Sequence, residues 1–316
     1  MTRIAYLGPA GTFCEEALLT QADLAQQDLV AYMTIEDALQ ALSNHTVDMA
    51  FLPMENAIEG TVNVTMDALA FDHHMLIQRE VVLPIVMTLM ARPGVSAADV
   101  TTVMSMPMAT AQCRQYFAKY LPGVQVMAAG STAEAARLVG ESDSTTIATV
   151  GPALSGKLYG LEVLATDIAD HPGNETRFVL LALSGVPAPT GHDKTSIVCF
   201  QSFDRPGSLL AMLQEFAARA INLVKLESRP TKNGLGNYCF IIDLEGHIAD
   251  ELVADCLRNL AAKTAEVKML GSFPAAGDHG PAKRVEATES WDRASVWLES
   301  YRDQISRDQI SRDQIS

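Results

Sequence analysis

The sequence predicts an α/β protein with two domains, a two-lobed, doubly wound first domain and a smaller second domain. The chain has 316 residues, which exceeds what one hydrophobic core usually serves. The first half alternates short apolar runs with helix-spaced segments, and the stretch 184–193, rich in Gly and Pro, separates it from a second alternation. Hydrophobic residues make up 48% and charged residues 19% of the chain, as is typical of globular domains.

Three strands and two helices are predicted at the start of the first domain. Apolar runs predict strands at 3–7, 30–33 and 47–53. Helical spacing predicts helices at 15–24 and at 35–42, and Thr34 is the expected cap of the second. This β-α-β-α-β order predicts a doubly wound layer.

The rest of the first domain, residues 1–183, continues the alternation. Further strands are predicted within 81–90 and at 100–104, 124–128, 145–150, 161–165 and 178–183. Helices are predicted at 107–120 and after Ser131, where Glu134 completes a capping-box signature. We expect two lobes, 1–78 with 166–183 and 79–165, with the chain crossing twice and a cleft between them.

The second domain, 194–273, follows the linker at 184–193. Strands at 196–200, 222–227, 238–244 and 267–270 and helices at 208–220 and 250–263 give the β-α-β-β-α-β order of a ferredoxin-like domain. An edge strand of such a sheet can pair with a second copy, so we expect self-association. The tail at 274–316 ends in a five-residue repeat, and we expect it to be partly disordered.

Charge and cysteine content exclude several classes of protein. The net charge is −15, and residues 1–183 hold 20 acidic against 8 basic side chains, so a nucleic-acid partner is not expected. The five cysteines are scattered and the seven histidines lack ligand spacing, which indicates reduced thiols and no metal site. The start has no signal-peptide pattern and no apolar run could span a bilayer, so we expect a soluble, cytoplasmic protein without a membrane partner.

Four segments of the first domain carry polar side chains next to predicted strands. Asn174-Glu175-Thr176-Arg177-Phe178 offers an amide, a hydroxyl and a guanidinium, although an ordinary loop would use the same residues. The segment PMENAIEGTV (53–62) follows a buried strand and carries adjacent Glu55 and Asn56, which could form one wall of a polar pocket; the alternative is an ordinary strand-to-helix turn. In SMPMATAQC (105–113), Ser105 is an expected helix cap.

The loop GPAGTF (8–13) is neither a Walker loop nor a dinucleotide fingerprint, so no nucleotide cofactor is predicted.

Together, these segments resemble the prephenate dehydratase family. The segments LGPAGTF, PMENAIEGTV, SMPMATAQC and NETRF stand in the family's order and spacing. In the second domain, DRPGSLL (204–210) and LESRP (226–230) are similar to the two phenylalanine-binding motifs of the family's ACT regulatory domain. The resemblance covers roughly residues 3–273. It implies that the catalytic domain resembles a type II periplasmic-binding-protein fold.

The resemblance also implies the site residues. Thr176 matches the catalytic threonine of the family's TRF motif, with Arg177 and Phe178 beside it. The implied substrate-binding residues are Glu55, Asn56, Ser105, Gln112, Asn174, Gly11 and Thr12. The implied effector-binding residues are Asp204, Gly207, Ser208, Leu209, Leu210, Glu227, Ser228 and Arg229.

The implied activity is the cofactor-independent conversion of prephenate to phenylpyruvate, CO2 and water, inhibited by L-phenylalanine bound between paired ACT domains. The implied assembly is a homodimer or a dimer of dimers through the ACT and catalytic domains. We expect Thr176 to hydrogen-bond the leaving hydroxyl. Arg177 either anchors a carboxylate or braces the threonine segment, and the sequence leaves both open. An arogenate dehydratase and a non-catalytic amino-acid sensor stay as alternatives.

Overall fold

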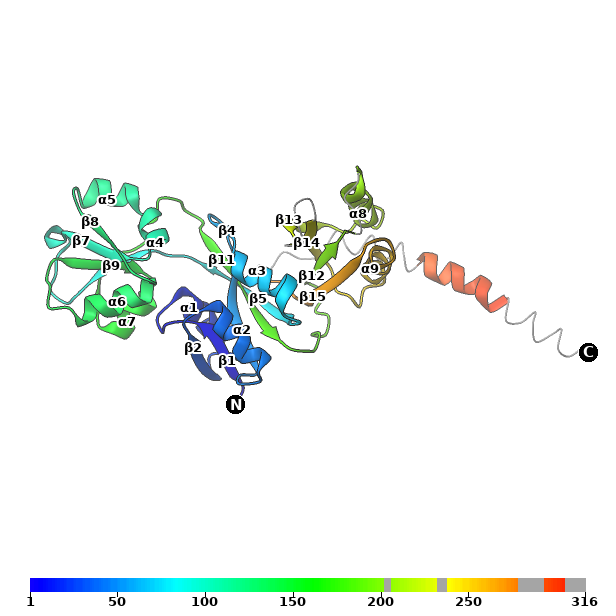
Figure 1. Ribbon diagram of the computed structural model, residues 1–316, viewed down its shortest axis with the longest axis horizontal. Helices are drawn as coiled ribbons and strands as arrows, with labels where there is room; N and C mark the ends of the chain where they lie inside the picture. The colour runs from blue at the N-terminus through cyan, green and yellow to red at the C-terminus, as the bar shows by residue number, and fades with distance from the viewer. Residues whose placement is uncertain (202–205, 232–237, 278–292, 305–316) are drawn as a thin grey trace, which may run out of the picture. The chain divides into compact units, whose positions relative to one another are not determined.

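The structure is a computed structural model, and it describes residues 1–201, 206–231, 238–277 and 293–304. The chain divides into two compact units, Met1–Val186 and Pro187–Ser316. The division lies within the segment that we expected to be a linker. The first unit contains two sheets and the second contains one (Figure 1).

The first lobe is built on the sheet β2-β1-β3-β11-β5, with the short β4 paired to β3. Parallel pairing joins β1 to β2 and to β3, whereas β11 is antiparallel to both β3 and β5. The strands are β1 (Arg3–Leu7), β2 (Asp28–Tyr32), β3 (Met49–Asn56), β4 (Gly60–Thr61), β5 (Leu76–Pro84) and β11 (Glu175–Ala182). The helices are α1 (Phe13–Leu19), α2 (Ile35–Ser43), α3 (Asn63–Asp67) and the π-helix η1 (Ala68–Asp72). The Thr34 hydroxyl caps α2 by accepting from the Asp37 amide, as predicted.

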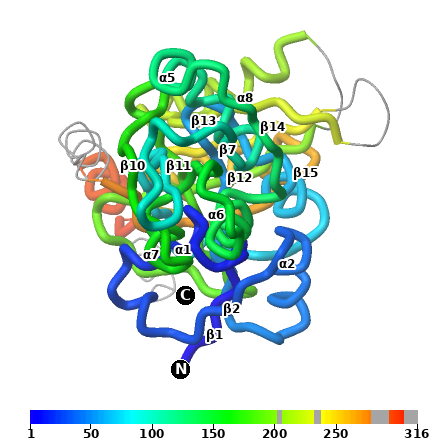
Figure 2. The backbone as a smooth tube through the Cα atoms, turned by 90° about the vertical axis from the view of Figure 1, so that its left-hand side faces the viewer, coloured from blue at the N-terminus to red at the C-terminus, as the bar shows by residue number. Residues whose placement is uncertain are grey.

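The second lobe is built on the sheet β10-β6-β9-β7-β8. Its strands are β6 (Thr88–Ala91), β7 (Thr102–Ser105), β8 (Gln125–Ala128), β9 (Ile147–Gly151) and β10 (Glu162–Ala165). Its helices are η2 (Ala97–Asp99), α4 (Pro107–Ala111), α5 (Arg114–Tyr120), α6 (Thr132–Glu141) and α7 (Ala153–Tyr159). Figure 2 follows the chain from β1 and β2 of the first lobe to α5, α6 and β7 of the second. Ser131 caps α6 by accepting from the Glu134 amide, as predicted.

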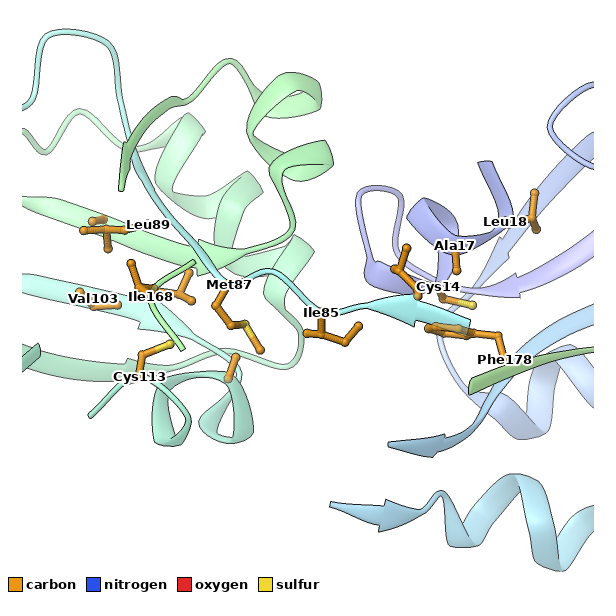
Figure 3. Close-up of a cluster of buried hydrophobic side chains, with 14 of the residues drawn as sticks. Cys14, Ala17, Leu18, Ile85, Met87, Leu89, Val103, Cys113, Ile168 and Phe178 are labelled. Carbon is orange, nitrogen blue, oxygen red and sulfur yellow. The ribbon is translucent and has the colours of Figure 1, made fainter. Parts of the chain in front are cut away.

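The two lobes are joined by two crossing segments that bond to each other. The Ile85 amide donates to the Asn174 carbonyl over 2.8 Å, and the Ile168 amide donates to the Met87 carbonyl over 3.0 Å. Ile85 and Met87 lie between the core of the first lobe, around Phe178, and that of the second (Figure 3). We expected the lobes to divide at Gln78, but β5 pairs with β11 as far as Pro84, so the first crossing follows Pro84.

One predicted helix of the second lobe is broken in two. We expected a single helix at 107–120, and the structure has α4 and α5 with Gln112 and Cys113 between them. The second crossing segment satisfies backbone groups at this break: the Asp170 amide donates to the Gln112 carbonyl, and the Asp170 carboxylate accepts from the Gln115 amide. The expected cap is also wrong, because Met106 holds the cap position and Ser105 is the last residue of β7.

The second unit has the predicted β-α-β-β-α-β order, with its sheet in the antiparallel order β13-β14-β12-β15. Its elements are β12 (Asp193–Phe200), α8 (Ser208–Ala217), β13 (Leu223–Pro230), β14 (Tyr238–Glu245), α9 (Glu251–Lys263) and β15 (Glu266–Pro274). Both helices pack on one face through apolar side chains such as Met212, Phe216 and Leu260. The ferredoxin-like prediction is therefore confirmed.

In the tail that we expected to be partly disordered, residues 293–304 are helical, and the side chains of Trp297 and Tyr301 on this helix are exposed. The five-residue repeat from Ile305 onward lies outside the described residues. Within the described part of the chain, no helix has the length and apolar character needed to cross a bilayer.

Candidate functional site

Thr176 and Asn56 form the centre of a polar network in the first lobe. They are register partners on the neighbouring strands β11 and β3, so their side chains share one face of the sheet. The Asn56 amide nitrogen donates to the Thr176 hydroxyl over 2.9 Å, and the Asn56 amide oxygen accepts from the backbone amides of Ile58 and Glu59. Thr176 is 9% exposed. Its hydroxyl is therefore held by an amide in a nearly water-free position.

Two more predicted residues extend this network to the second lobe. The Asn56 amide nitrogen also donates to Asn174 Oδ1 over 2.8 Å, and Asn174 Nδ2 donates to Gln112 Oε1 over 2.9 Å. Gln112 Nε2 then donates to Glu59 Oε1 over 3.1 Å. Asn174 and Gln112 are both buried. The structure thus brings Thr176, Asn56, Asn174 and Gln112 together.

Glu55 and Arg177 lie on the opposite face of the same sheet. We expected both pairs, Glu55 with Asn56 and Thr176 with Arg177, at strand ends, but β3 runs through Asn56 and β11 begins at Glu175. Side chains of successive strand residues point to opposite faces. Arg177 Nε therefore meets Glu80 Oε2 at 2.7 Å, with Glu55 Oε2 at 3.8 Å from Arg177 Nη1. Of the two roles left open for Arg177, this geometry supports bracing of the strand.

Phe178 is a core residue. It is 2% exposed and stacks on Phe51, with ring centroids 5.5 Å apart and planes 11° apart. Figure 3 shows it beside Cys14 of α1. Phe178 therefore holds β11 against β3 and α1 beneath the position of Thr176, and it does not join the polar network.

Gly11 and Thr12 lie at a second contact between the lobes. The Tyr159 hydroxyl of α7 donates to the Ala10 carbonyl over 2.7 Å. A Cβ on Gly11, whose φ is +90°, would lie 3.2 Å from Ser155 of α7, so only glycine allows this approach. The Gly11 amide donates to the Glu15 carboxylate. Thr12 caps α1 and donates to the Leu7 carbonyl.

Burial and the Glu15 carboxylate together raise the pKa of the Tyr6 hydroxyl beneath this loop. Tyr6 therefore stays protonated, and the neighbouring Glu15 carboxylate accepts from the Gly11 amide. These contacts give the 8–12 loop a structural role, and its predicted contact with substrate stays a prediction.

Ser105 is fully buried, and its hydroxyl donates to the Val150 carbonyl over 2.5 Å. It thereby joins the ends of β7 and β9. Its predicted contact with substrate stays a prediction.

The predicted effector residues lie on two elements of the second unit. Gly207 has a φ of +86° and precedes α8, which begins with Ser208, Leu209 and Leu210. Glu227, Ser228 and Arg229 lie on β13, where the Arg229 guanidinium donates to the Glu227 carboxylate over 3.2 Å. Asp204 lies outside the described residues. A joint role of these two elements in effector binding stays a prediction.

Two acidic residues of the site were missed by sequence reasoning. Glu59 lies inside the segment PMENAIEGTV, only three residues beyond Asn56, and Glu80 is the acidic residue that precedes a long apolar run. A carboxylate next to an apolar run that forms a buried strand calls for a buried cationic partner. That signal could have paired Glu80 with Arg177, the nearest arginine to Thr176.

The cysteines take no part in this chemistry. All five are free and buried, as expected of reduced thiols. Burial raises the pKa of the thiols of Cys14, Cys113, Cys199 and Cys256 to about 12, so these side chains are protonated at neutral pH.

The network offers hydrogen-bond donors and acceptors in fixed directions around one hydroxyl. Thr176 accepts from Asn56, and a hydroxyl has one donor and two acceptor positions, so its proton is left to donate elsewhere. Such a group can stabilise a departing oxygen.

Comparisons with known proteins show the family of the chain. The family profile described as prephenate dehydratase matches residues 4–185, and the profile of the ACT domain matches residues 195–262. A protein named prephenate dehydratase from Mycolicibacterium vanbaalenii is 41% identical over 319 residues, covering 96% of this chain and 99% of its own.

Solved structures also match nearly the whole chain. A prephenate dehydratase from Arthrobacter aurescens in complex with L-Phe superimposes with a TM-score of 0.88 at 36% identity, covering 95% of this chain and 99% of that one. GqqA, described as a novel type of quorum quenching acylase, superimposes with a TM-score of 0.76 at 25% identity, covering 87% and 98%. The prephenate dehydratase profile matches more than half of the chain, and the relative from Mycolicibacterium covers nearly all of it, so this protein belongs to the prephenate dehydratase family.

Proposed function

We propose that this protein is a prephenate dehydratase that converts prephenate to phenylpyruvate, CO2 and water, and that L-phenylalanine regulates it through the ACT domain. The observation that carries the proposal is the Asn56–Thr176 hydrogen bond of 2.9 Å, in a chain whose family membership is shown. This bond leaves the hydroxyl proton of Thr176 available to the departing oxygen of the substrate.

The reaction needs only modest help from the protein. As the C–C bond to the ring carboxylate breaks, its electron pair enters the ring, CO2 leaves, and the ring hydroxyl departs from the opposite position. The ring becomes aromatic, which supplies much of the driving force. Thr176 donates a hydrogen bond to the departing oxygen, and one proton taken up from the bulk solvent (H3O+ or buffer acid) converts the departing hydroxide to the second product, water. This contact strengthens as negative charge develops on that oxygen, so it lowers the barrier selectively.

Arg177 contributes to this mechanism indirectly. It is paired with buried Glu80 on the sheet face opposite Thr176 and fixes β11 against β5. With its guanidinium engaged there, we expect Arg177 not to anchor a carboxylate of the substrate. Since residues 1–183 carry a net charge of −12, long-range attraction of a dianion is weak, and the affinity depends on local contacts.

The likeness to a quorum quenching acylase does not extend to a nucleophile at this site. Acyl transfer needs a nucleophile with a neighbouring base. Thr176 is bonded to the carboxamide of Asn56, and a carboxamide nitrogen that donates cannot also take up a proton. The site geometry therefore favours hydrogen bonding to a leaving group.

Self-association through the ACT domain is also part of the proposal. Strand β13 is the first in the sheet order, and Val224 and Leu226 on it are 43% and 44% exposed. An exposed strand edge with apolar side chains is suited to pairing with a second copy. We propose a homodimer or a dimer of dimers, which light scattering coupled to gel filtration would measure. The buried free cysteines support a reducing compartment, the cytoplasm.

The test is a phenylpyruvate assay with prephenate and arogenate in parallel, for the wild type and Thr176→Ala. We expect turnover of prephenate by the wild type and a loss of about 100-fold or more in kcat for the variant, because one donor to a developing oxyanion is removed. Preferential turnover of arogenate would reassign the substrate. Turnover of neither substrate would favour an amino-acid sensor, and equal rates for both proteins would remove Thr176 from the mechanism.

A further inference from the structure

Glu59 begins and ends a closed ring of hydrogen bonds that contains the predicted site amides. Its backbone amide donates to Asn56 Oδ1 over 2.9 Å. Asn56 then donates to Asn174, Asn174 to Gln112, and Gln112 to the Glu59 carboxylate, over 2.8, 2.9 and 3.1 Å. Glu59 is itself exposed, whereas Asn174 and Gln112 are 4% and 7% exposed.

All the bonds of this ring run in one direction. A side-chain amide has one acceptor end and one donor end, so fixing one amide fixes the next. Two backbone amides fix the oxygen of Asn56, which turns its nitrogen toward Asn174 and Thr176. Asn174 and Gln112 follow in the same sense, and Gln112 Nε2 therefore needs an acceptor at its far side. An ionised carboxylate has acceptor positions only, so Glu59 satisfies that need whichever oxygen it presents.

The ring also connects the two lobes. Asn56 ends β3 and Glu59 lies in the turn before β4 of the first lobe, whereas Gln112 lies between α4 and α5 of the second. The bond between Gln112 and Glu59 is therefore a contact across the lobes, made beside the residue that holds the Thr176 hydroxyl.

We propose that Glu59 is a positioning residue for the dehydration: its carboxylate accepts from Gln112 of the second lobe, completes the ring, and so holds in place the oriented amides that direct the Thr176 proton toward the substrate. This inference rests on the proposed function. Glu59 acts through Gln112, Asn174 and Asn56, and it needs no contact with substrate. The property that matters is an acceptor at this position.

The first experiment compares Glu59→Ala with Glu59→Gln in the phenylpyruvate assay. Removal of a charged hydrogen-bond acceptor should lower kcat by about 10- to 100-fold with a smaller change in KM. Glu59→Gln keeps an oxygen that can accept from Gln112, and it should stay within about threefold of the wild type. Because Glu59 is exposed, both variants should melt at the wild-type temperature. Glu175→Ala is the matched control. Glu175 is also an exposed glutamate and lies next to Thr176, but the Glu175 side chain is not part of the ring.

The second experiment exchanges the two end groups of the ring. Gln112→Glu alone places two carboxylates against each other and should lose at least as much activity as Glu59→Ala. Adding Glu59→Gln leaves a single carboxylate in the pair, now on the second lobe, and this carboxylate can accept both from Asn174 and from the amide introduced on the first lobe. The double variant should recover at least tenfold over Gln112→Glu.

The outcomes separate this inference from the proposed function. Turnover by the wild type tests the function by itself. If the wild type is active and Glu59→Ala matches it in kcat, the positioning role is overturned. It is equally overturned if Glu59→Gln is as impaired as Glu59→Ala, or if the double variant is no better than Gln112→Glu. Loss in Glu59→Ala with rescue in Glu59→Gln and in the double variant supports it.

Discussion

Arg177 Nε lies 2.7 Å from Glu80 Oε2, and the Glu80 side chain at this contact is fully buried. Arg177 itself retains only 11% exposure, and Glu55 Oε2 lies 3.8 Å from its guanidinium. The family motif thus joins two neighbours with different tasks. Thr176 faces the amide network, and Arg177 ties β11 to the adjacent strand β5.

The Arg177–Glu80 pair should be required for stability. Arg177→Ala removes the guanidinium from the buried Glu80 carboxylate, and we expect the apparent free energy of unfolding to fall by about 3–5 kcal/mol. The double variant Arg177→Met with Glu80→Leu should recover most of this loss, because an apolar pair can replace a buried ion pair. Urea unfolding followed by circular dichroism measures both. A raised KM in Arg177→Lys with unchanged stability would show instead that Arg177 anchors substrate.

Phe178 should matter for folding and not for substrate contact. Phe178→Ala removes the ring stacked on Phe51, and we expect a loss of about 3–5 kcal/mol, with a smaller loss for Phe178→Leu. The melting temperatures of the wild type, Phe178→Leu and Phe178→Ala, measured by thermal unfolding, should fall in that order. Phe178→Leu should keep the wild-type KM. A large increase in KM at wild-type stability would return Phe178 to the substrate site.

Gly207 should be needed for the response to L-phenylalanine. Its φ of +86° is unfavourable for any residue with a Cβ, so Gly207→Val should rebuild the start of α8. We expect turnover with and without L-phenylalanine to become equal, and the ligand-induced rise in melting temperature to vanish. Gly94→Val is the control, since Gly94 has a φ of +84° in the first unit. If L-phenylalanine inhibits Gly207→Val over the same concentration range as the wild type, the loop at Gly207 takes no part in binding the effector.

The ion pairs between α8 and α9 should stabilise the second unit in a pH-dependent way. Lys263, followed by Arg219, holds the pKa of the Glu215 carboxyl below its usual value. A carboxyl with a lowered pKa stabilises the folded state at neutral pH, and this contribution disappears as the pH falls through its folded pKa. Lys263→Met should therefore lower the melting temperature at neutral pH but not in strong acid, below the folded pKa. A difference that is constant with pH would contradict this assignment.

Local patterns determined much of this protein. The alternation of apolar runs and helical segments gave the two-lobed first domain and the ferredoxin-like second domain, because the periods of strands and helices are local properties of the chain. The caps at Thr34 and Ser131 follow from the same short-range chemistry. Six sequence motifs in a fixed order were sufficient to identify the family.

Only the tertiary structure decided which polar residues meet. Glu55 and Arg177 are register partners although they lie far apart in the sequence, and so are Asn56 and Thr176. This antiparallel pairing extends β3 and β11 into segments that the sequence patterns predict to be loops. Because side chains alternate along a strand, adjacent residues in these segments then lie on opposite faces of the sheet. The pairing of β11 with β5 likewise places the first crossing after Pro84, and the contact between the lobes brings Glu59 to Gln112. No local pattern encodes such partners, because the register between distant strands is fixed by packing of the whole sheet.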